Sequence, residues 1–395
     1  MPDAAPSAAA FPRNPGIDAL RGLSILLVVL HHLALRIPLK QTALADFVPG
    51  RLLAALSWNG YSAVFVFFVI SGFLIATHAL GRWGALARID ARAFYLRRAA
   101  RILPLLLALL AVLSVLHLAG TPDYVIAGAQ QSLGRALLAA LGLHLNWYEG
   151  VTGYLPGNWD VLWSLSIEEA FYLGFPLACL LLRDARVLFA ALLLGAVSLP
   201  LALAALAGSN EIWQEKAYLP GMAAIAAGVC AALTAARVRP RRALAGALCG
   251  LGGGGLAAAL LCGPWLWRAL GNGTMLLLTL SVAVLLVGLH WRQQLAPRAG
   301  RRGLGWLRVQ GRLSYEIYLT HMFVVFAVVA LFRAAGADLR SGFWWYLPAV
   351  ALCWALGALL ARYFTDPCDR AIRRRWLRPP GPARSAAPAE AESAA

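Results

Sequence analysis

Long apolar stretches recur along the whole chain, and each is about as long as a helix that crosses a lipid bilayer. Such a helix needs about 20 mostly apolar residues. Ten stretches fit: residues 17–37, 57–80, 102–119, 160–182, 187–207, 218–236, 243–262, 273–290, 313–333 and 344–364. An eleventh, residues 133–146, is too short to span, and we expect it to be re-entrant or interfacial. The pattern predicts an all-α polytopic membrane protein.

The arginines between these stretches predict how the helices are oriented. Six arginines lie in segment 81–101, four in 237–242 and six in 291–312. Cytoplasmic loops of membrane proteins carry an excess of Lys and Arg. Ten spans with both termini in the cytoplasm place all of these segments inside, and they place the arginine-poor segments 147–159 and 208–217 outside. We therefore predict this orientation.

Composition supports the membrane assignment and excludes other classes. The chain is 61% hydrophobic and 13% charged, well below the charged fraction of a soluble domain. Its net charge of +17 is dispersed over short loops, which argues against nucleic-acid binding. The six cysteines show no metal-ligand spacing, so we predict no metal site. Residues 1–16 and 379–395 are low in complexity and are expected to be disordered tails around one membrane domain, residues 17–378.

The first apolar stretch carries three charged or titratable groups on one face. Arg21 and His32 are eleven residues apart, which is three helical turns plus roughly 20°. Asp18 lies within roughly 40° of His32, whereas His31 is rotated by about 80°. Ionisable groups inside a membrane helix are costly and usually mark a functional pathway. The stripe of Asp18, Arg21 and His32 is therefore a candidate active site.

Two adjacent glutamates, Glu168 and Glu169, lie in the fourth span. They are about eight residues from its outer end, a depth of roughly 12 Å. Each glutamate costs about 2.5–3.5 kcal/mol on insertion scales. Nothing in a purely structural span requires two such residues. A buried ion pair or helix-to-helix hydrogen bonds are the alternative. By the same count His32 is about 7–8 Å deep, so we expect it at a depth comparable to that of the glutamates.

Polar groups in two other spans extend the candidate site. The ninth span holds Glu316 and Tyr318 near its inner end and His321 about a third of the way across. In the second span, Ser71 and Gly72 would let a neighbouring helix or an acyl chain approach closely. Ser71 is not in a GxSxG motif, which argues against a hydrolase nucleophile.

An arginine cluster precedes the third span. Arg97, Arg98 and Arg101 lie in FYLRRAARILP, with Arg98 and Arg101 one helical turn apart. Topology alone would place arginines there, but a guanidinium is also the best side chain for binding phosphate. Both interpretations stay open on the residues alone.

Taken in order, several segments resemble the acyltransferase-3 family of integral membrane acyltransferases. They are IDALRGLSILLVVLHH, VFFVISGFLI, FYLRRAARILPLLL, WSLSIEEAFYL and GRLSYEIYLTH, and the resemblance covers residues 15 to about 370. The family's Arg-x10-His motif falls on Arg21 and His32. Its Arg-x-x-Arg motif falls on Arg98 and Arg101, and its WSLS-acidic segment on residues 163–169.

The resemblance implies an enzyme that O-acylates an acceptor at the outer face of the bacterial cytoplasmic membrane. It implies an essential His32, acyl-CoA (most often acetyl-CoA) as the cytoplasmic donor, and a ten-span fold. The acceptor would be a carbohydrate or a lipid-linked glycan. Some family members carry a fused SGNH-type domain after the last span. Only a short tail follows Phe364 here, so a second transfer step would need another protein.

Together these observations give a mechanistic hypothesis. His32 would act as general base, oriented by Glu168 or Glu169, or would carry the acyl group as an acyl-histidine. Asp18 and Arg21 would pair, and Arg97, Arg98, Arg101 and Ser71 would bind the donor. Candidate substrate contacts are Trp163, Ser166, Tyr172, Tyr318 and His321. External aromatic residues could stack on sugar rings: Trp147, Tyr148, Tyr154, Trp159 and Trp213.

The rival function is a transporter or flippase without acyl-transfer chemistry. Ten spans with intramembrane charge suit that class, and the glycine-rich segment 250–255 could be a broken helix. Against it, neither half of the chain repeats the other.

Overall fold

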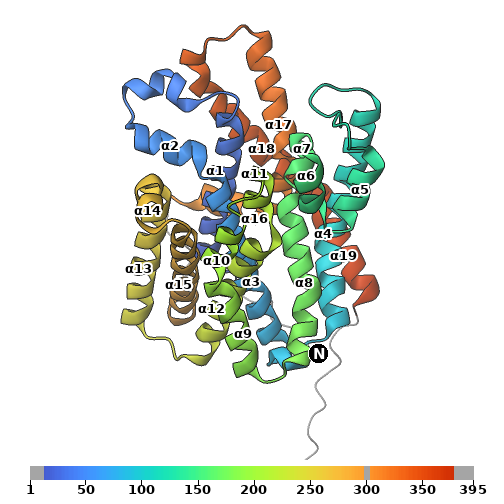
Figure 1. Cartoon of the computed structure of the whole chain (residues 1–395). Helices are drawn as coiled ribbons and strands as arrows, with labels where there is room; N and C mark the ends of the chain where they lie inside the picture. The colour runs from blue at the N-terminus through green and yellow to red at the C-terminus, as the bar shows by residue number, and fades with distance from the viewer. Residues whose placement is uncertain (1–12, 298–302, 378–395) are drawn as a thin grey trace, which may run out of the picture.

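All regular secondary structure is helical in the part of the chain that this computed structural model describes, residues 13–297 and 303–377 (Figure 1). The long helices are α1 (Pro15–Ala34), α3 (Gly60–Trp83), α4 (Ala91–Leu118), α8 (Trp163–Leu181), α12 (Tyr218–Arg237), α13 (Arg242–Leu261), α15 (Gly273–Leu295), α17 (Ser314–Ala334) and α18 (Tyr346–Leu360). The shorter α-helices are α2 (Gly50–Trp58), α5 (Leu133–Leu141), α6 (Leu145–Thr152), α7 (Gly157–Asp160), α9 (Ala185–Val197), α10 (Leu199–Ala205), α11 (Glu211–Lys216), α14 (Gly263–Leu270), α16 (Gly305–Arg312) and α19 (Asp366–Trp376). Four 3₁₀-helices, η1 (Leu39–Gln41), η2 (Ala43–Asp46), η3 (Leu86–Arg88) and η4 (Leu339–Trp345), and one π-helical turn, η5 (Ala361–Thr365), complete the described chain.

The helices confirm the predicted class, a multi-pass integral membrane protein. Nine described helical segments are long and apolar enough to cross a bilayer, and the bent pair α9–α10 would make a tenth. The 46° bend falls where Pro200 occupies the first turn of α10, because proline lacks the amide hydrogen that a continuous helix needs. The predicted span 187–207 therefore corresponds to the bent pair α9–α10.

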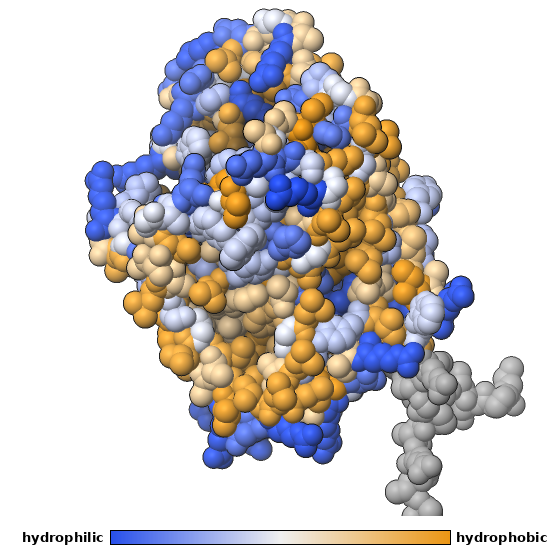
Figure 2. All heavy atoms as spheres, turned by 45° about the vertical axis from the view of Figure 1, so that its right-hand side comes forward, coloured by the Kyte–Doolittle hydropathy of each residue, from blue (hydrophilic) through white to orange (hydrophobic). Residues whose placement is uncertain are grey.

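Figure 2 shows a broad apolar surface with hydrophilic residues gathered toward both ends.

The short apolar stretch forms two helices that do not span. Residues 133–146 become α5 and the beginning of α6, which are joined through Leu143 in a left-handed backbone conformation with φ of 59°. Neither helix is a candidate span. This agrees with the prediction of a re-entrant or interfacial segment.

Alternating helix directions gather the connecting segments at two ends of the bundle. The lower end in Figure 1 carries segments 84–90 and 238–241, and we name it the arginine-rich end. Helices α2, α5 and α6 lie toward the other end, which we name the opposite end. The cytoplasmic location of the arginine-rich end stays a prediction.

Two helices begin earlier than predicted because polar side chains cap them. Asp90 accepts a hydrogen bond of 2.9 Å from the amide of Ala93, so α4 begins at residue 91 and not at 102. The arginines at 97, 98 and 101, which we expected just before the third span, thus lie within the spanning helix itself. Asn14 caps α1 in the same way, so the predicted tail 1–16 is two residues too long. Residues 1–12 of that tail and the predicted tail 379–395 lie outside the described residues.

Helix α12 is the most buried span and packs directly on α3. A Cβ atom built on Gly72 would lie 1.9 Å from the carbonyl oxygen of Ile225, and one on Gly228 would lie 2.0 Å from that of Val69. The backbones of the two helices therefore touch, as small residues permit in membrane helices. Gly72 was expected to let either a neighbouring helix or an acyl chain approach closely, and in the structure it is the neighbouring helix α12 that does so.

Gly72→Ala should therefore destabilise the protein. The added methyl group meets backbone, which cannot turn away, so we expect a loss at the upper end of the 1–3 kcal/mol range typical of overpacking, about 3 kcal/mol. Thermal unfolding in detergent measures it. Gly250→Ala in α13 is the matched control, since no atom of the described residues lies within 4 Å of a Cβ atom there. Equal unfolding temperatures for the two variants would contradict the close approach.

Candidate active site

Two histidines from different helices, His32 of α1 and His321 of α17, face one another inside the bundle. Their ring centroids are 4.9 Å apart, and Nε2 of His321 lies 3.4 Å from Nδ1 of His32. His321 is fully buried and His32 is half-buried. Because His32 is close to the last residue of α1, the pair lies in the half of the bundle farther from the arginine-rich end.

The hydrogen bonds of these rings determine which nitrogen carries the proton. Nδ1 of His32 lies 2.9 Å from the carbonyl oxygen of Val28, which can only accept. Nδ1 therefore carries the hydrogen, and Nε2 of the neutral ring keeps its lone pair. The same argument applies to His321, whose Nδ1 lies 2.7 Å from the oxygen of Tyr318. The lone pair on Nε2 of His321 thus faces the N–H of His32.

Tyr318 fixes the depth of this pair relative to α8. Its hydroxyl donates to the carbonyl oxygen of Val161 at 3.0 Å and lies 2.7 Å from Oγ of Ser164. Residues 161–164 are therefore level with Tyr318, which lies about one helical turn before His321 on α17. Glu168 and Glu169 follow Ser164 by four and five residues, about 6–8 Å closer to the arginine-rich end. The predicted common depth of His32 and the glutamates is therefore wrong.

The glutamates belong to a second polar cluster, around Arg98. The guanidinium of Arg98 lies 3.7 Å from the ring centroid of Tyr172, and its Nη2 is 3.8 Å from Oε1 of Glu169. The hydroxyl of Tyr172 in turn bonds to Ser71. Glu168 lies beside this cluster, half-buried. The predicted role of Glu168 or Glu169 in orienting His32 is corrected: His321 stands beside that ring.

The Arg98 cluster has unused hydrogen-bonding capacity. Nε of Arg98, Oε1 of Glu169 and Nε of Arg97 are buried, and none has a hydrogen-bond partner among the described residues. Buried polar atoms are nearly always paired in proteins. The cluster is thus suited to a polar ligand that would supply the missing partners.

A third cluster surrounds Arg101. Its guanidinium contacts Oε1 of Glu316 at 3.0 Å and Oδ1 of Asp366 at 3.6 Å. Glu316 is fully buried and also accepts a 2.8 Å hydrogen bond from Thr365, in the π-helical turn η5. Arg98 and Arg101 therefore contact different helices, α8 and α17, although they are one turn apart on α4.

The lower part of the predicted stripe on α1 is arranged differently from our expectation. Arg21 donates a 2.8 Å hydrogen bond to Oγ of Ser314 at the beginning of α17. Across residues 13–297 and 303–377 no ion pair within 4.0 Å joins Arg21 and Asp18, so the two charges attract one another without the direct contact that we predicted. His31 bonds to the carbonyl oxygen of Ser57 at 2.8 Å and takes no part in the histidine pair's contact with α17.

Several predicted substrate contacts are occupied by packing. Oγ of Ser166 accepts a hydrogen bond from the amide of Leu145 at 3.3 Å. Trp163 packs edge-on against Phe68. Trp159, proposed for sugar stacking, is fully buried and cannot reach a sugar. Of the predicted substrate contacts, His321 lies beside His32, and the ring of Tyr318 lies 6.0 Å from that of His321.

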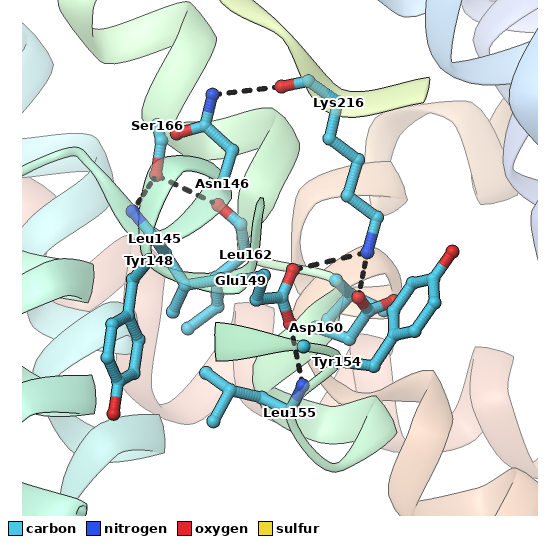
Figure 3. A network of polar contacts seen from close by, with 12 residues as sticks. Leu145, Asn146, Tyr148, Glu149, Tyr154, Leu155, Asp160, Leu162, Ser166 and Lys216 are labelled. Atoms are coloured by element: carbon cyan, nitrogen blue, oxygen red, sulfur yellow. Dashed lines mark hydrogen bonds and ion pairs between the residues drawn. The ribbon is translucent and has the colours of Figure 1, made fainter. Parts of the chain in front are cut away.

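Sequence reasoning missed a buried ionic network at the opposite end (Figure 3). Lys216 of α11 pairs with Glu149 of α6 at 3.1 Å and with Asp160 of α7. Burial, together with the neighbouring Asp160, raises the pKa of Glu149, and Lys216 opposes that shift. One signal was available: only Lys40 and Lys216 are lysines among the 35 basic residues. Among the described residues, no cluster of His, Cys, Asp or Glu is arranged to hold a metal ion.

Comparison with known proteins agrees with this architecture. A family profile described as an acyltransferase domain, of the acyltransferase-3 type, matches residues 14–363. O-acetyltransferase OatA of Staphylococcus aureus (strain NCTC 8325 / PS 47) is 30% identical over 174 residues, which are 41% of this chain and 24% of that protein. A putative O-acetyltransferase of Staphylococcus aureus (strain COL) is 31% identical over 170 residues, with the same shares.

The aligned region therefore spans about a quarter of the length of these relatives. No solved structure matches the chain significantly. The family profile, by contrast, covers nearly the whole membrane domain and includes the histidine pair and the arginine clusters. The chain belongs to the acyltransferase-3 family.

Proposed function

We propose that this protein is a membrane-bound O-acyltransferase. It moves an acyl group, most often acetyl, from cytoplasmic acyl-CoA to a hydroxyl of a carbohydrate or glycolipid at the outer face of the membrane. The single observation that carries the proposal is the lone pair on Nε2 of His32, which the hydrogen bond from Nδ1 to Val28 leaves available. A neutral imidazole with that tautomer is a general base near neutral pH.

The transfer step uses that nitrogen directly. Nε2 of His32 takes the proton of the acceptor hydroxyl while the oxygen attacks the thioester carbonyl. A carbon–oxygen bond forms, the carbon–sulfur bond breaks, and the CoA thiolate leaves and is protonated by the imidazolium. The positive charge that His32 carries in between is stabilised through its Nδ1–H by Val28 and by Nε2 of His321. A carboxylate performs that task in hydrolytic triads.

The covalent version of the reaction uses the same nitrogen. Nε2 of His32 would attack the thioester, and the acyl-imidazole would pass its acyl group to the acceptor. The two versions differ in one measurable exchange. Only the covalent version transfers label between acetyl-CoA and free CoA in the absence of acceptor.

The unpaired atoms of the Arg98 cluster support a donor site there. The buried Nε atoms of Arg97 and Arg98 have no acceptor within the described part of the chain. Phosphate or carbonyl oxygens of CoA would supply acceptors through charge-assisted hydrogen bonds. Tyr172 and Ser71 follow on the side toward the bundle interior. The acyl group would thus approach His32 from the arginine-rich end and the acceptor from the opposite end.

Oriented membrane vesicles test the proposed function. Labelled acetyl-CoA is supplied on the cytoplasmic side only, and base-labile label is measured on surface glycans of membranes with and without the protein. We expect label that depends on the protein. Uptake of an unmodified glycan without ester formation would instead favour the transporter function.

Arg98→Ala should weaken donor use more than it slows the chemical step. We expect the KM for acetyl-CoA to rise about tenfold, because one charge-assisted contact is worth roughly 1.5–3 kcal/mol. Arg88→Ala is the matched control, since Arg88 is exposed at the same end in η3. Equal KM values for the two variants would contradict the donor assignment.

A further inference from the structure

A hollow of about 360 Å³ lies between α5 and α6, outside the clusters described above. Arg135 and Leu138 of α5 line one side, and Trp147 and Tyr148 of α6 line the other, with His144 between the helices. Both helices belong to the opposite end of the bundle (Figure 1). The proposed reaction assigns no role to any of these side chains.

The hollow is a fixed feature, because polar bonds anchor α6 to the spans behind it. The amide of Leu145 donates to Ser166 of α8 at 3.3 Å, and the side chain of Asn146 donates to the carbonyl oxygen of Lys216 at 2.9 Å. Figure 3 shows these bonds beside the ionic network of Lys216. A site built on such anchors keeps its shape before a ligand arrives.

The charge in the hollow is positive and uncompensated. Within the described ranges no carboxylate lies within ion-pair distance of Arg135. Its Nη1 donates to the carbonyl oxygen of Gln130 at 3.1 Å, and its guanidinium lies 5.6 Å from the ring centroid of Tyr148. Several of its five donors therefore have no acceptor among the described residues, and the exposed His144 adds a ring N–H. This arrangement is suited to a phosphate.

The surroundings of the hollow are apolar and exposed. Leu138 is 69% exposed, Val151 60%, and Leu118 at the end of α4 76%. These residues belong to a helix end and to α5 and α6, which are not candidate spans, so we expect them at the level of the lipid headgroups. A ligand whose phosphate contacts Arg135 would therefore have its hydrocarbon chain along α4, in the membrane.

Trp147 adds a surface for a sugar. It is 56% exposed, and the ring of Trp213 holds it from the side at a centroid distance of 5.0 Å, with the planes 85° apart. A rigid exposed indole of this kind offers an apolar face and a polar edge to a pyranose ring. Phosphate contact, hydrocarbon contact and ring stacking are thus combined within one hollow.

We propose that the hollow between α5 and α6 binds the phosphate and first sugar of a lipid-linked saccharide, which is the acceptor. The inference rests on the proposed acyl transfer and narrows its acceptor to lipid-linked glycans. Residues 163–166 of α8 connect the wall of this hollow to Tyr318, through the bonds of Leu145 to Ser166 and of Ser164 to Tyr318.

Binding measured without donor tests this inference separately from catalysis. The full chain in detergent is titrated with a polyprenyl phosphate that carries one hexose, with the same lipid without the sugar, and with phosphatidylglycerol. We expect Arg135→Gln to weaken binding of both polyprenyl phosphates at least tenfold, and Trp147→Ala to weaken only the sugar-bearing one. Arg268→Gln in α14 is the matched control, an exposed arginine toward the same end.

Three outcomes would overturn the inference. Unchanged binding in Arg135→Gln removes the phosphate site. Equal affinity for phosphatidylglycerol makes it a site for bulk lipid, and a change of oligomeric state in Leu138→Gln makes it a contact between copies of the chain. His32→Ala must bind the probes like the wild type. If His32→Ala loses transfer but binds the lipid normally, catalysis and lipid binding are separate. A failure of the acceptor site can then be told apart from a failure of the proposed function.

Discussion

Replacing His32 with alanine should lower acyl transfer from labelled acetyl-CoA by about 10²–10⁴-fold, the usual contribution of a general base. The ring supplies the only lone pair that the histidine pair leaves unoccupied, on Nε2. Transfer to the surface glycan is measured in membranes that contain equal amounts of each variant. Folding is verified by the unfolding temperature, because His32 is half-buried and its loss need not collapse the bundle.

Two variants distinguish the base from its neighbours. His31→Ala should retain most of the transfer, because His31 bonds to the carbonyl oxygen of Ser57 and faces α2. In His321→Ala, the bond to Val28 should still hold His32 in the same tautomer. The variant removes the second acceptor beside the Nδ1–H of His32, which is Nε2 of His321. We therefore expect an intermediate loss, about tenfold, and an altered pH–rate profile. Near-full transfer by His32→Ala would disprove the assignment.

In Lys216→Met, the opposite end of the bundle should unfold at a lower temperature than in the wild type. It leaves the fully buried Glu149 beside Asp160 without a cation, and breaking a buried ion pair from one side costs about 3–5 kcal/mol. Unfolding in detergent measures the loss. Lys40→Met is the control, because Lys40, the other lysine, is exposed.

The dependence of this loss on pH identifies its cause. Burial and Asp160 already raise the pKa of Glu149, and removing Lys216 takes away the opposing influence. In the variant the folded state then binds more protons than the unfolded state at pH values above the ordinary pKa of glutamate. Stability should therefore fall as the pH rises and recover as the pH is lowered toward that value. Adding Glu149→Gln should restore most of the stability at neutral pH, and a flat pH profile would contradict an uncompensated carboxylate.

The number and position of the spans could be predicted from the sequence, because lipid requires an apolar run of fixed length wherever a helix crosses. Helix ends were less predictable. The capping side chain of Asp90 extends α4 by eleven residues, and hydropathy carries no trace of a cap. Residues 97–101, which we expected just before the third span, therefore lie inside α4.

The chemistry of the site was predictable only one helix at a time. Helical periodicity places Arg21 and His32 on one face of α1, but it cannot say which helix faces them. That choice depends on contacts such as the bond from Arg21 to Ser314, between residues 293 positions apart. His321 could be named as polar and intramembrane, whereas its position beside His32 could not. Counting residues from position 160 gave the wrong depth for the glutamates. The span begins earlier, with the short helix α7, so the glutamates lie deeper than that count implies.

The π-helical turn at residues 361–365 makes the C-terminal helix sensitive to chain length. Such a turn contains one more residue than an α-helical turn, so everything after Thr365 is rotated by about 100° relative to an unbroken helix. That rotation brings Asp366 to Arg101. Removal of a single residue within this turn would restore a regular helix and turn Asp366 away, whereas substitutions that keep the length would not. At this point the spacing of the chain, more than the identity of its side chains, keeps α19 in register with α4.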